Sequence, residues 1–463
     1  MVDADVSKGR REHRHADLLV LGGTALTPNG PQRIDVACLD GRIVALGDLQ
    51  RAWSADITMK ATGLHVLPGV IDSQVHFREP GLTHKEDLEA GTRGAVLGGV
   101  TTIFEMPNTD PLTLSADDLE DKLQAARHRA WCDYAFYIGG SNVNAEHLQE
   151  LEMLPGCAGV KVFMGSSFGD LLTDEEEVLR SILSHGRRRL AVHAEDEARL
   201  RERKTIVESS GDVCQHPLWR DVPSALMATQ RIVRLAAETG RRIHVLHVST
   251  AEEMAFLAEH KRRVTVEVTP HHLSLSAPEC YERLGSLAQM NPPIREQHHL
   301  NALWRAIRDG VVDVIGSDHA PHTLDEKARP YPLSPSGMTG VQTLLPLMLD
   351  HIHAGRLSLQ RLVDLTSAGP ARVFGVEGKG RIAVGYDADL TIVDLAARRT
   401  VRNNWIASRS GWTPYDGLTV TGWPIHTVVR GCPVVREEVM TDDPARGRPV
   451  QFLEFAPSLQ PPP

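Results

Sequence analysis

The sequence contains no long apolar segment. It has no run of about 18 apolar residues, the length that a transmembrane helix requires. Residues 1–16 are polar and charged, without the apolar region of a signal peptide. We therefore expect a cytoplasmic protein with no membrane partner and a tail at residues 1–16.

Paired cysteines and an excess of positive charge are also absent. The six cysteines are scattered and lack the short spacings of zinc fingers or disulfide frameworks. We expect free, buried thiols in a reducing compartment. The formal net charge is −10, the wrong sign for a surface that binds nucleic-acid phosphates. A nucleic-acid partner is therefore not expected.

A glycine-rich phosphate fingerprint after an early strand is missing too, which disfavours an open, doubly wound sheet. The chain instead alternates apolar strands with helix-length segments, among them 115–129 with Ser115 as a plausible N-cap and 225–240 ending on Gly240. The eight strand candidates are 66–77, 101–106, 134–138, 159–164, 190–193, 243–248, 264–268 and 312–316. Eight such repeats predict an α/β fold of the (β/α)₈ barrel type.

Both ends of the chain have the pattern of a β domain. The early segment contains short apolar runs and a hairpin signal at Asp40-Gly41, and the late segment alternates turns with strands. We predict a small flanking β-sandwich built from residues 17–66 plus 375–450. The barrel would then span 67–374, and 451–463 would be a Pro-rich tail.

Several chemically active side chains fall where the predicted barrel strands end. His76 and Arg78 follow the first strand, His193 and His247 end the fifth and sixth, and Asp318 follows the eighth. In (β/α)₈ barrels, catalytic residues lie at the carboxyl ends of the strands. Imidazoles and a carboxylate suit Zn²⁺, and a metal site can activate water and polarise a carbonyl. Unrelated polar residues in the core are the weaker interpretation.

Lys161 lies inside an apolar strand, where a charged amine is costly to bury. A neutral amine there could act as a base. Alternatively, CO₂ could convert it to a carbamate that bridges two metal ions. The apolar neighbours on both sides argue against a lysine that merely reaches the surface.

The sequence resembles the cyclic amidohydrolases, and among them the dihydroorotases, over about residues 17–430. The set HFREPG, MPN, NPPIR and SDHAPH is more specific to dihydroorotases than to their relatives that act on allantoin or hydantoins. The matching pieces are PGVIDSQVHFREPG (68–81), GGVTTIFEMPNTDP (98–111), GVKVFMGSS (159–167), VHAED (192–196), HVLHVST (244–250), VTPHHL (268–273), MNPPIR (290–295), GSDHAPHT (316–323) and GRIAVGYDADLTIVD (380–394).

The resemblance implies a role for each matching position. The metal ligands would be His76, carbamylated Lys161, His193, His247 and Asp318, with Asp318 also the catalytic proton shuttle. Arg78, Asn108 and His322 would bind the substrate carboxylate, and Asn291 would line the ring. A guanidinium with amide and imidazole donors suits an anion. His271 and His319 lie nearby in sequence, and we interpret both as structural.

One position departs from the family pattern. The usual first-strand motif is His-x-His, whereas here it is Gln74-Val75-His76. A carboxamide is a weaker Zn²⁺ ligand than an imidazole. We therefore expect one tightly held zinc ion and a second, weaker one.

The implied reaction is the reversible, zinc-dependent hydrolysis of dihydroorotate to N-carbamoyl-aspartate in pyrimidine biosynthesis, with a small-molecule substrate and a homodimeric enzyme. One alternative is hydrolysis of another cyclic amide, such as allantoin or a hydantoin. The other is a non-catalytic barrel that associates with aspartate carbamoyltransferase. Intact ligand and carboxylate-binding positions favour an active enzyme, because a scaffold has no need of them.

Overall fold

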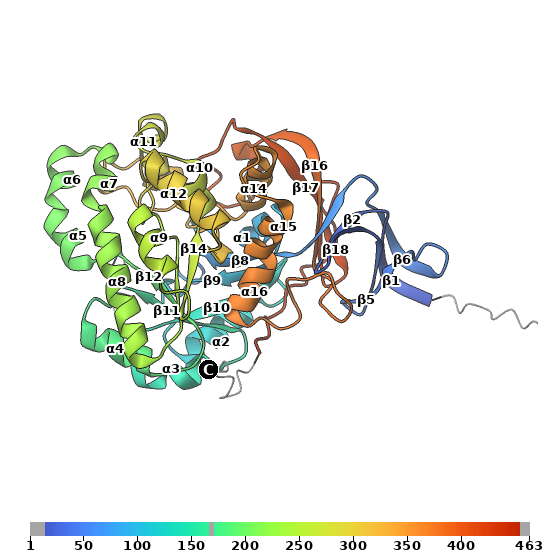
Figure 1. The fold of residues 1–463 in the computed structure, drawn as a ribbon, viewed down its shortest axis with the longest axis horizontal. Helices are drawn as coiled ribbons and strands as arrows, with labels where there is room; N and C mark the ends of the chain where they lie inside the picture. Colours follow the sequence, from blue (N-terminus) through green and yellow to red (C-terminus); the bar gives the residue numbers. More distant parts are fainter. Residues whose placement is uncertain (1–13, 166–170, 454–463) are drawn as a thin grey trace, which may run out of the picture.

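The computed structural model describes residues 14–165 and 171–453, in which eight parallel strands form a nearly closed barrel (Figure 1). The expected tails lie largely outside these ranges, as do residues 166 and 167 of the GVKVFMGSS motif. The barrel strands, in their order around the sheet, are β8 (Val70–Val75), β9 (Val100–Glu105), β10 (Asp133–Gly139), β11 (Cys157–Phe163), β12 (Leu190–His193), β13 (Ile243–Val245), β14 (Val264–Val268) and β15 (Val314–Ile315). A parallel bridge between Val75 and His319 brings the two edges of this sheet together.

Helices cover the outside of the barrel (Figure 1). The predicted caps are confirmed: Ser115 accepts the backbone N–H of Asp118, and Gly240 ends its helix in the left-handed conformation. The helices are α1 (Leu88–Leu97), α2 (Ala116–Ala126), α3 (Leu148–Leu151), α4 (Glu176–Ser184), α5 (Glu197–Arg203), α6 (Thr205–Ser210), α7 (His216–Trp219), α8 (Val222–Thr239), α9 (Ala251–Ala258), α10 (Pro270–Ser274), α11 (Glu279–Leu284), α12 (Gln297–Arg308), α13 (Leu324–Lys327), α14 (Leu344–His353), α15 (Leu359–Val363) and α16 (Gly369–Phe374). Among the described residues, no helix has the length and apolarity that a membrane crossing requires.

Two further sheets, drawn from both ends of the chain, flank the barrel on one side (Figure 1). One has the order β5-β4-β1-β6 and the other β19-β18-β17-β16-β7-β2-β3. Their strands are β1 (Arg14–Leu21), β2 (Thr24–Thr27), β3 (Gly30–Arg33), β4 (Asp35–Leu39), β5 (Arg42–Gly47), β6 (Trp53–Lys60), β7 (His65–Pro68), β16 (Leu390–Thr400), β17 (Thr419–Val429), β18 (Cys432–Arg436) and β19 (Val439–Met440). A shared apolar core that includes Val36, Val66 and Leu390 packs between residues of both ends.

The predicted first barrel strand, residues 66–77, is two strands. β7 pairs antiparallel with β16 in the flanking sheet, whereas β8 pairs parallel with β9 in the barrel. Gly69 separates them, and a Cβ there would lie only 2.1 Å from the Thr101 hydroxyl oxygen. An unbroken apolar run does not reveal such a change of sheet, because both strands are buried.

Both predicted tails are shorter than expected: the tail at 1–16 ends earlier, and the tail at 451–463 begins later. Arg14 to Ala16 belong to β1, which starts three residues before the predicted sandwich. At the other end, Phe452 forms a bridge with Val376 and packs its ring against Phe104, 5.7 Å between centroids. All six cysteines are free thiols; four are buried, and Cys214 and Cys432 are half-buried.

A buried lysine joins the barrel to the flanking sheets. Lys379 Nζ lies 2.5 Å from a carboxylate oxygen of Asp133, the first residue of β10. It also lies 3.0 Å from Asp387 and 2.5 Å from Asp389, both just before β16. The three carboxylates could suggest a cation site, but the ammonium already lies among them and Arg430 is 2.9 Å from Asp133.

Replacing Lys379 by methionine should therefore destabilise the fold. The variant removes the ammonium that lies among three buried carboxylates, and removing one partner of a buried pair costs about 3–5 kcal/mol. Urea unfolding is the measurement, and the midpoint should fall with little change in the m-value. An unchanged midpoint would mean that the junction does not depend on this ion-pair cluster.

Candidate active site

The structure brings all nine predicted site residues to one cavity of about 350 Å³ at the carboxyl ends of the barrel strands. They come from segments up to 246 residues apart, and Gln74 joins them. The predicted residues in its wall are His76, Arg78, Asn108, Lys161, His193, His247, Asn291, Asp318 and His322. This placement is that of a barrel active site.

His193 and His247 present ring nitrogens to each other. His193 Nδ1 lies 3.0 Å from His247 Nε2, and both rings are buried. The other nitrogen of His193 faces a carboxylate oxygen of Glu195 at 2.9 Å. A carboxylate partner fixes the proton on that nitrogen and leaves the lone pair of Nδ1 directed at His247.

Glu195 and Arg220 support His193 from behind, and the sequence analysis did not identify either. Arg220 donates to both oxygens of Glu195, at 3.1 and 2.5 Å. Burial alone would raise the pKa of Glu195, but the Arg220 guanidinium and His193 lower it to about 2. The carboxylate is therefore ionised. His193 and Glu195 are two residues apart at the end of a strand, so their side chains lie on the same side. This spacing is the sequence signal that predicts Glu195 as a partner of His193.

His76 lies between Asn108 and Asp318. Its Nδ1 is 2.7 Å from the Asn108 side-chain oxygen, which can only accept, so Nδ1 carries the proton. The Nε2 lone pair then faces Asp318 Oδ1 at 3.3 Å. Burial lowers the pKa of His76, in keeping with a neutral ring.

Gln74 contacts the same carboxylate oxygen. Its side-chain amide donates to Asp318 Oδ1 at 2.9 Å, and its own oxygen is buried without a hydrogen-bond partner among the described residues. A buried acceptor without a donor is unusual in a folded protein. The Gln74 side-chain oxygen is therefore available to bind a ligand.

Lys161 is buried in β11, with its amine 4.3 Å from the centroid of the Phe163 ring. No ion pair of the described residues includes it. Burial lowers the pKa of Lys161 to about 7, and the charges of Asp318 and Glu267 offset this only in part. A large fraction of the amine is therefore neutral near pH 7, and the neutral form is the one that can react with CO₂.

Arg78 is a buried cation with no carboxylate in contact among the described residues. Its Nε donates to the Pro321 carbonyl at 3.2 Å, and a terminal nitrogen lies 3.3 Å from His322 Nε2. Burial lowers the pKa of Arg78 to about 10, so it remains protonated at neutral pH. A buried, unpaired guanidinium favours the entry of an anion.

Asn291 is oriented by a histidine that the sequence analysis did not identify. The Asn291 side-chain oxygen lies 3.0 Å from His216 Nε2, while His216 Nδ1 faces the Tyr331 hydroxyl at 3.0 Å. The carboxamide nitrogen of Asn291 thus remains for a ligand. His216 comes from α7, far from Asn291 along the chain, and nothing in the local sequence links them.

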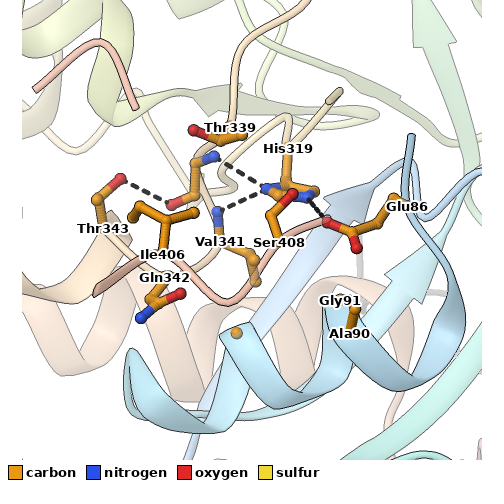
Figure 2. A pocket seen from close by; sticks show the side chains of 12 residues that line it. Glu86, Ala90, Gly91, His319, Thr339, Val341, Gln342, Thr343, Ile406 and Ser408 are labelled. Carbon is orange, nitrogen blue, oxygen red and sulfur yellow. Dashed lines mark hydrogen bonds and ion pairs between the residues drawn. The ribbon is translucent and has the colours of Figure 1, made fainter. Parts of the chain in front are cut away.

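His319 and His271 lie outside the wall of this cavity. Figure 2 shows the His319 ring facing Glu86. His319 Nε2 lies 3.2 Å from Glu86, and the backbone N–H of Gly340 donates to Nδ1 at 3.0 Å. His271 Nδ1 lies 2.9 Å from the Tyr415 hydroxyl, and the two rings stack. Both contacts fit the structural interpretation given to these residues.

The donor set suits a divalent metal ion. Two nitrogens on one tetrahedral Zn²⁺ lie roughly 3.3 Å apart, given bonds of about 2.0–2.1 Å, and His193 Nδ1 and His247 Nε2 are 3.0 Å apart. His76 Nε2 and Asp318 Oδ1 form a second pair of facing donors, 3.3 Å apart. The carboxylate behind His193 is the support that zinc-binding histidines typically have.

Comparison with known proteins agrees with this geometry. Residues 65–434 match the Amidohydrolase family. The chain is 37% identical over 440 residues to a dihydroorotase of Methanosarcina mazei, with 92% of this chain and 95% of that protein covered. It is 35% identical to an allantoinase of Deinococcus radiodurans, with 93% and 98% covered.

Solved structures extend the likeness to the whole fold. An L-hydantoinase (dihydropyrimidinase) from Arthrobacter aurescens superposes with a TM-score of 0.89 at 30% identity, covering 94% of this chain and 99% of that one. A dihydropyrimidinase from Brevibacillus agri gives 0.87 at 27% identity, covering 95% and 99%. Together with the site, these likenesses show that the chain belongs to the amidohydrolase family, among its hydrolases of cyclic amides.

Proposed function

We propose that this cyclic amidohydrolase is a dihydroorotase, which interconverts (S)-dihydroorotate and N-carbamoyl-L-aspartate in de novo pyrimidine biosynthesis. The observation that carries the proposal is that Arg78, in the wall of the cavity, is buried and contacts no carboxylate of the described residues. Dihydroorotate bears a carboxylate, whereas hydantoin and allantoin do not. Relatives named dihydroorotase, at 31–38% identity, support the same substrate.

The metal would be zinc. Lys161, as a carbamate, His193 and His247 would hold one ion, and His76 and Asp318 with the shared carbamate would hold a second, weaker one. Such an ion supplies Lewis acidity toward a carbonyl and lowers the pKa of water. Amidohydrolases are typically metal-dependent, and the donor set described above is compatible with zinc.

The residues of this chain would then bind, orient and move a proton. The Arg78 guanidinium binds the substrate carboxylate, with Asn108 and His322 as further donors and Asn291 at the ring. The Gln74 amide donates to Asp318 Oδ1 and orients this carboxylate. Asp318 accepts the proton of the attacking water and returns it to the ring nitrogen when the amide C–N bond breaks.

Turnover of a panel of cyclic amides tests the proposed substrate. We expect kcat/KM to be highest for dihydroorotate and at least about 100-fold lower for hydantoin and allantoin, which lack the carboxylate. A preference for either neutral amide would assign the chain to the hydantoinase or allantoinase branch. Both branches occur among the relatives of this chain.

Gln74 is expected to limit the metal content. A carboxamide is a poorer zinc donor than an imidazole, so Gln74→His should raise the zinc content from about one to about two ions per chain. Elemental analysis after exhaustive dialysis measures this, with Gln74→Leu as a control that adds no ligand. Two full zinc ions in the unsubstituted protein would show that Gln74 does not weaken the second position.

Association with a second copy of the chain or with aspartate carbamoyltransferase stays a prediction. A non-catalytic role would require a barrel that keeps a substrate-binding site for no purpose. Arg78, which has no carboxylate in contact among the described residues, lines one cavity with Asn108, Asn291 and His322, and this arrangement favours catalysis.

A further inference from the structure

Two segments that are not neighbours in sequence form part of the cavity wall. One is the turn after α13, represented in the wall by residues 332 and 334–337, and the other carries Gln289 and Asn291. The segment 322–337, rich in proline and glycine, thus supplies part of the wall. The shape of the cavity therefore depends on how firmly these segments are joined.

Lys327, the last residue of α13, lies between them with its side chain fully buried. Its ammonium donates to the carbonyl oxygens of Gln289 at 3.2 Å, Pro335 at 2.8 Å and Gly337 at 3.1 Å. All three carbonyls belong to residues of the cavity wall. One buried cation thus ties both segments together through their backbones.

Lys327 has no carboxylate in contact among the described residues. Burial lowers the pKa of Lys327 to about 7. Burying an amine without a counter-charge is costly, and an apolar residue of similar length would avoid this cost. The three carbonyl oxygens around its amine explain why a lysine is tolerated here. Hydrogen bonding to these carbonyls is the role that an apolar residue could not fill.

Gln289 makes a second connection across the same gap. Its side-chain nitrogen donates to the Ser334 carbonyl at 3.0 Å and contacts the Ser336 hydroxyl at 3.0 Å. Its side-chain oxygen accepts from the Ser334 hydroxyl at 2.8 Å, and its backbone carbonyl accepts from Gly337 N–H at 2.9 Å. Both the side chain and the backbone of Gln289 therefore hold the turn in place.

The turn at residues 334–337 also orients His322, which is predicted to bind the substrate carboxylate. His322 Nδ1 lies 3.2 Å from the Lys85 ammonium, and Nε2 lies 3.3 Å from a terminal nitrogen of Arg78. The same Nε2 lies 3.1 Å from the Ser336 carbonyl oxygen, so the turn contacts the His322 ring directly. Trp412, whose ring lies 5.8 Å from the Lys327 ammonium, donates to the His322 carbonyl at 2.7 Å.

We propose that Lys327 is a positioning residue for substrate binding, which holds residues 334–337 against Gln289 and thereby sets the orientation of His322. Its effect on KM rests on the proposed function. Because Lys327 does not line the cavity, it acts through the backbone of the turn and not by touching the substrate. It should influence substrate affinity far more than the chemical step.

Lys327→Met tests this by two separate measurements. The first is steady-state kinetics: KM for dihydroorotate should rise about tenfold while kcat stays within about threefold, the pattern of lost ground-state and transition-state binding. The second is hydrogen exchange without substrate: amides of 333–337 should exchange at least about tenfold faster, with barrel amides unchanged. Lys379→Met is the matched control, since it also removes a buried lysine but lies at the domain junction, so its KM should stay unchanged.

Unchanged KM or unchanged exchange at 333–337 in a folded Lys327→Met chain would overturn the proposal. If that variant does not fold, Gln289→Leu replaces it, with the same expected rise in KM and exchange and the same overturning result. Failure of the proposed function is distinguishable. An unsubstituted chain that does not turn over dihydroorotate refutes the substrate, and the exchange comparison still decides whether Lys327 holds the turn.

Discussion

Replacing Lys161 by alanine should abolish metal retention and the turnover of cyclic amides. Lys161 is the one predicted ligand shared by both metal positions, and it is buried between apolar neighbours. Changes behind a metal ligand already cost about 10–100-fold in affinity or activity, so losing a bridging ligand should cost more. Zinc content by elemental analysis and kcat for dihydroorotate are the two measurements.

The cavity left by Lys161→Ala offers a sharper version of the same test. Acetate or propionate should partly restore zinc content and turnover, because a short carboxylate can occupy the position of the carbamate. Formamide, of similar size but uncharged, is the control and should restore neither. Full zinc content and full turnover in the alanine variant would exclude the bridging role.

Replacing Arg78 by methionine should raise KM for dihydroorotate strongly and leave zinc content unchanged. The substrate carboxylate would lose its buried partner, a loss of about 2–5 kcal/mol, which corresponds to roughly 30- to 5,000-fold in binding. Methionine keeps most of the side-chain volume, so the cavity is preserved. Steady-state kinetics and elemental analysis on one preparation measure both quantities.

Hydantoin provides the internal control for Arg78. It has no carboxylate, so any residual activity toward it should change by less than about threefold in the variant. An equal loss for hydantoin and dihydroorotate would point to a disturbed site instead of a lost anion contact. Unchanged kinetics with dihydroorotate would remove Arg78 from the substrate-binding residues.

The barrel and the position of its site could be predicted because both depend on local patterns. Apolar strands alternating with helical segments indicated the barrel, and polar residues at strand ends indicated its catalytic edge. The break at Gly69 could not be predicted in the same way. It depends on the Thr101 side chain of the neighbouring strand, which leaves no room for a Cβ.

Residues that hold the site side chains in place were harder to predict than the side chains that would bind metal or substrate. Arg220 reaches Glu195 across 25 positions of sequence, and Lys327 reaches back 38 positions to Gln289. Such contacts follow from tertiary packing and have no local periodicity. A buried lysine in a short helix has the same sequence signature as an exposed one, so its role emerged only from the carbonyls around it.

The most direct test of the account measures dihydroorotate turnover and zinc content in the same preparation of the unsubstituted protein. We predict hydrolysis of dihydroorotate and cyclisation of N-carbamoyl-aspartate, both in proportion to bound zinc, both lost on chelation and both restored when zinc is returned. A protein that carries its full zinc content and converts neither compound would contradict the account.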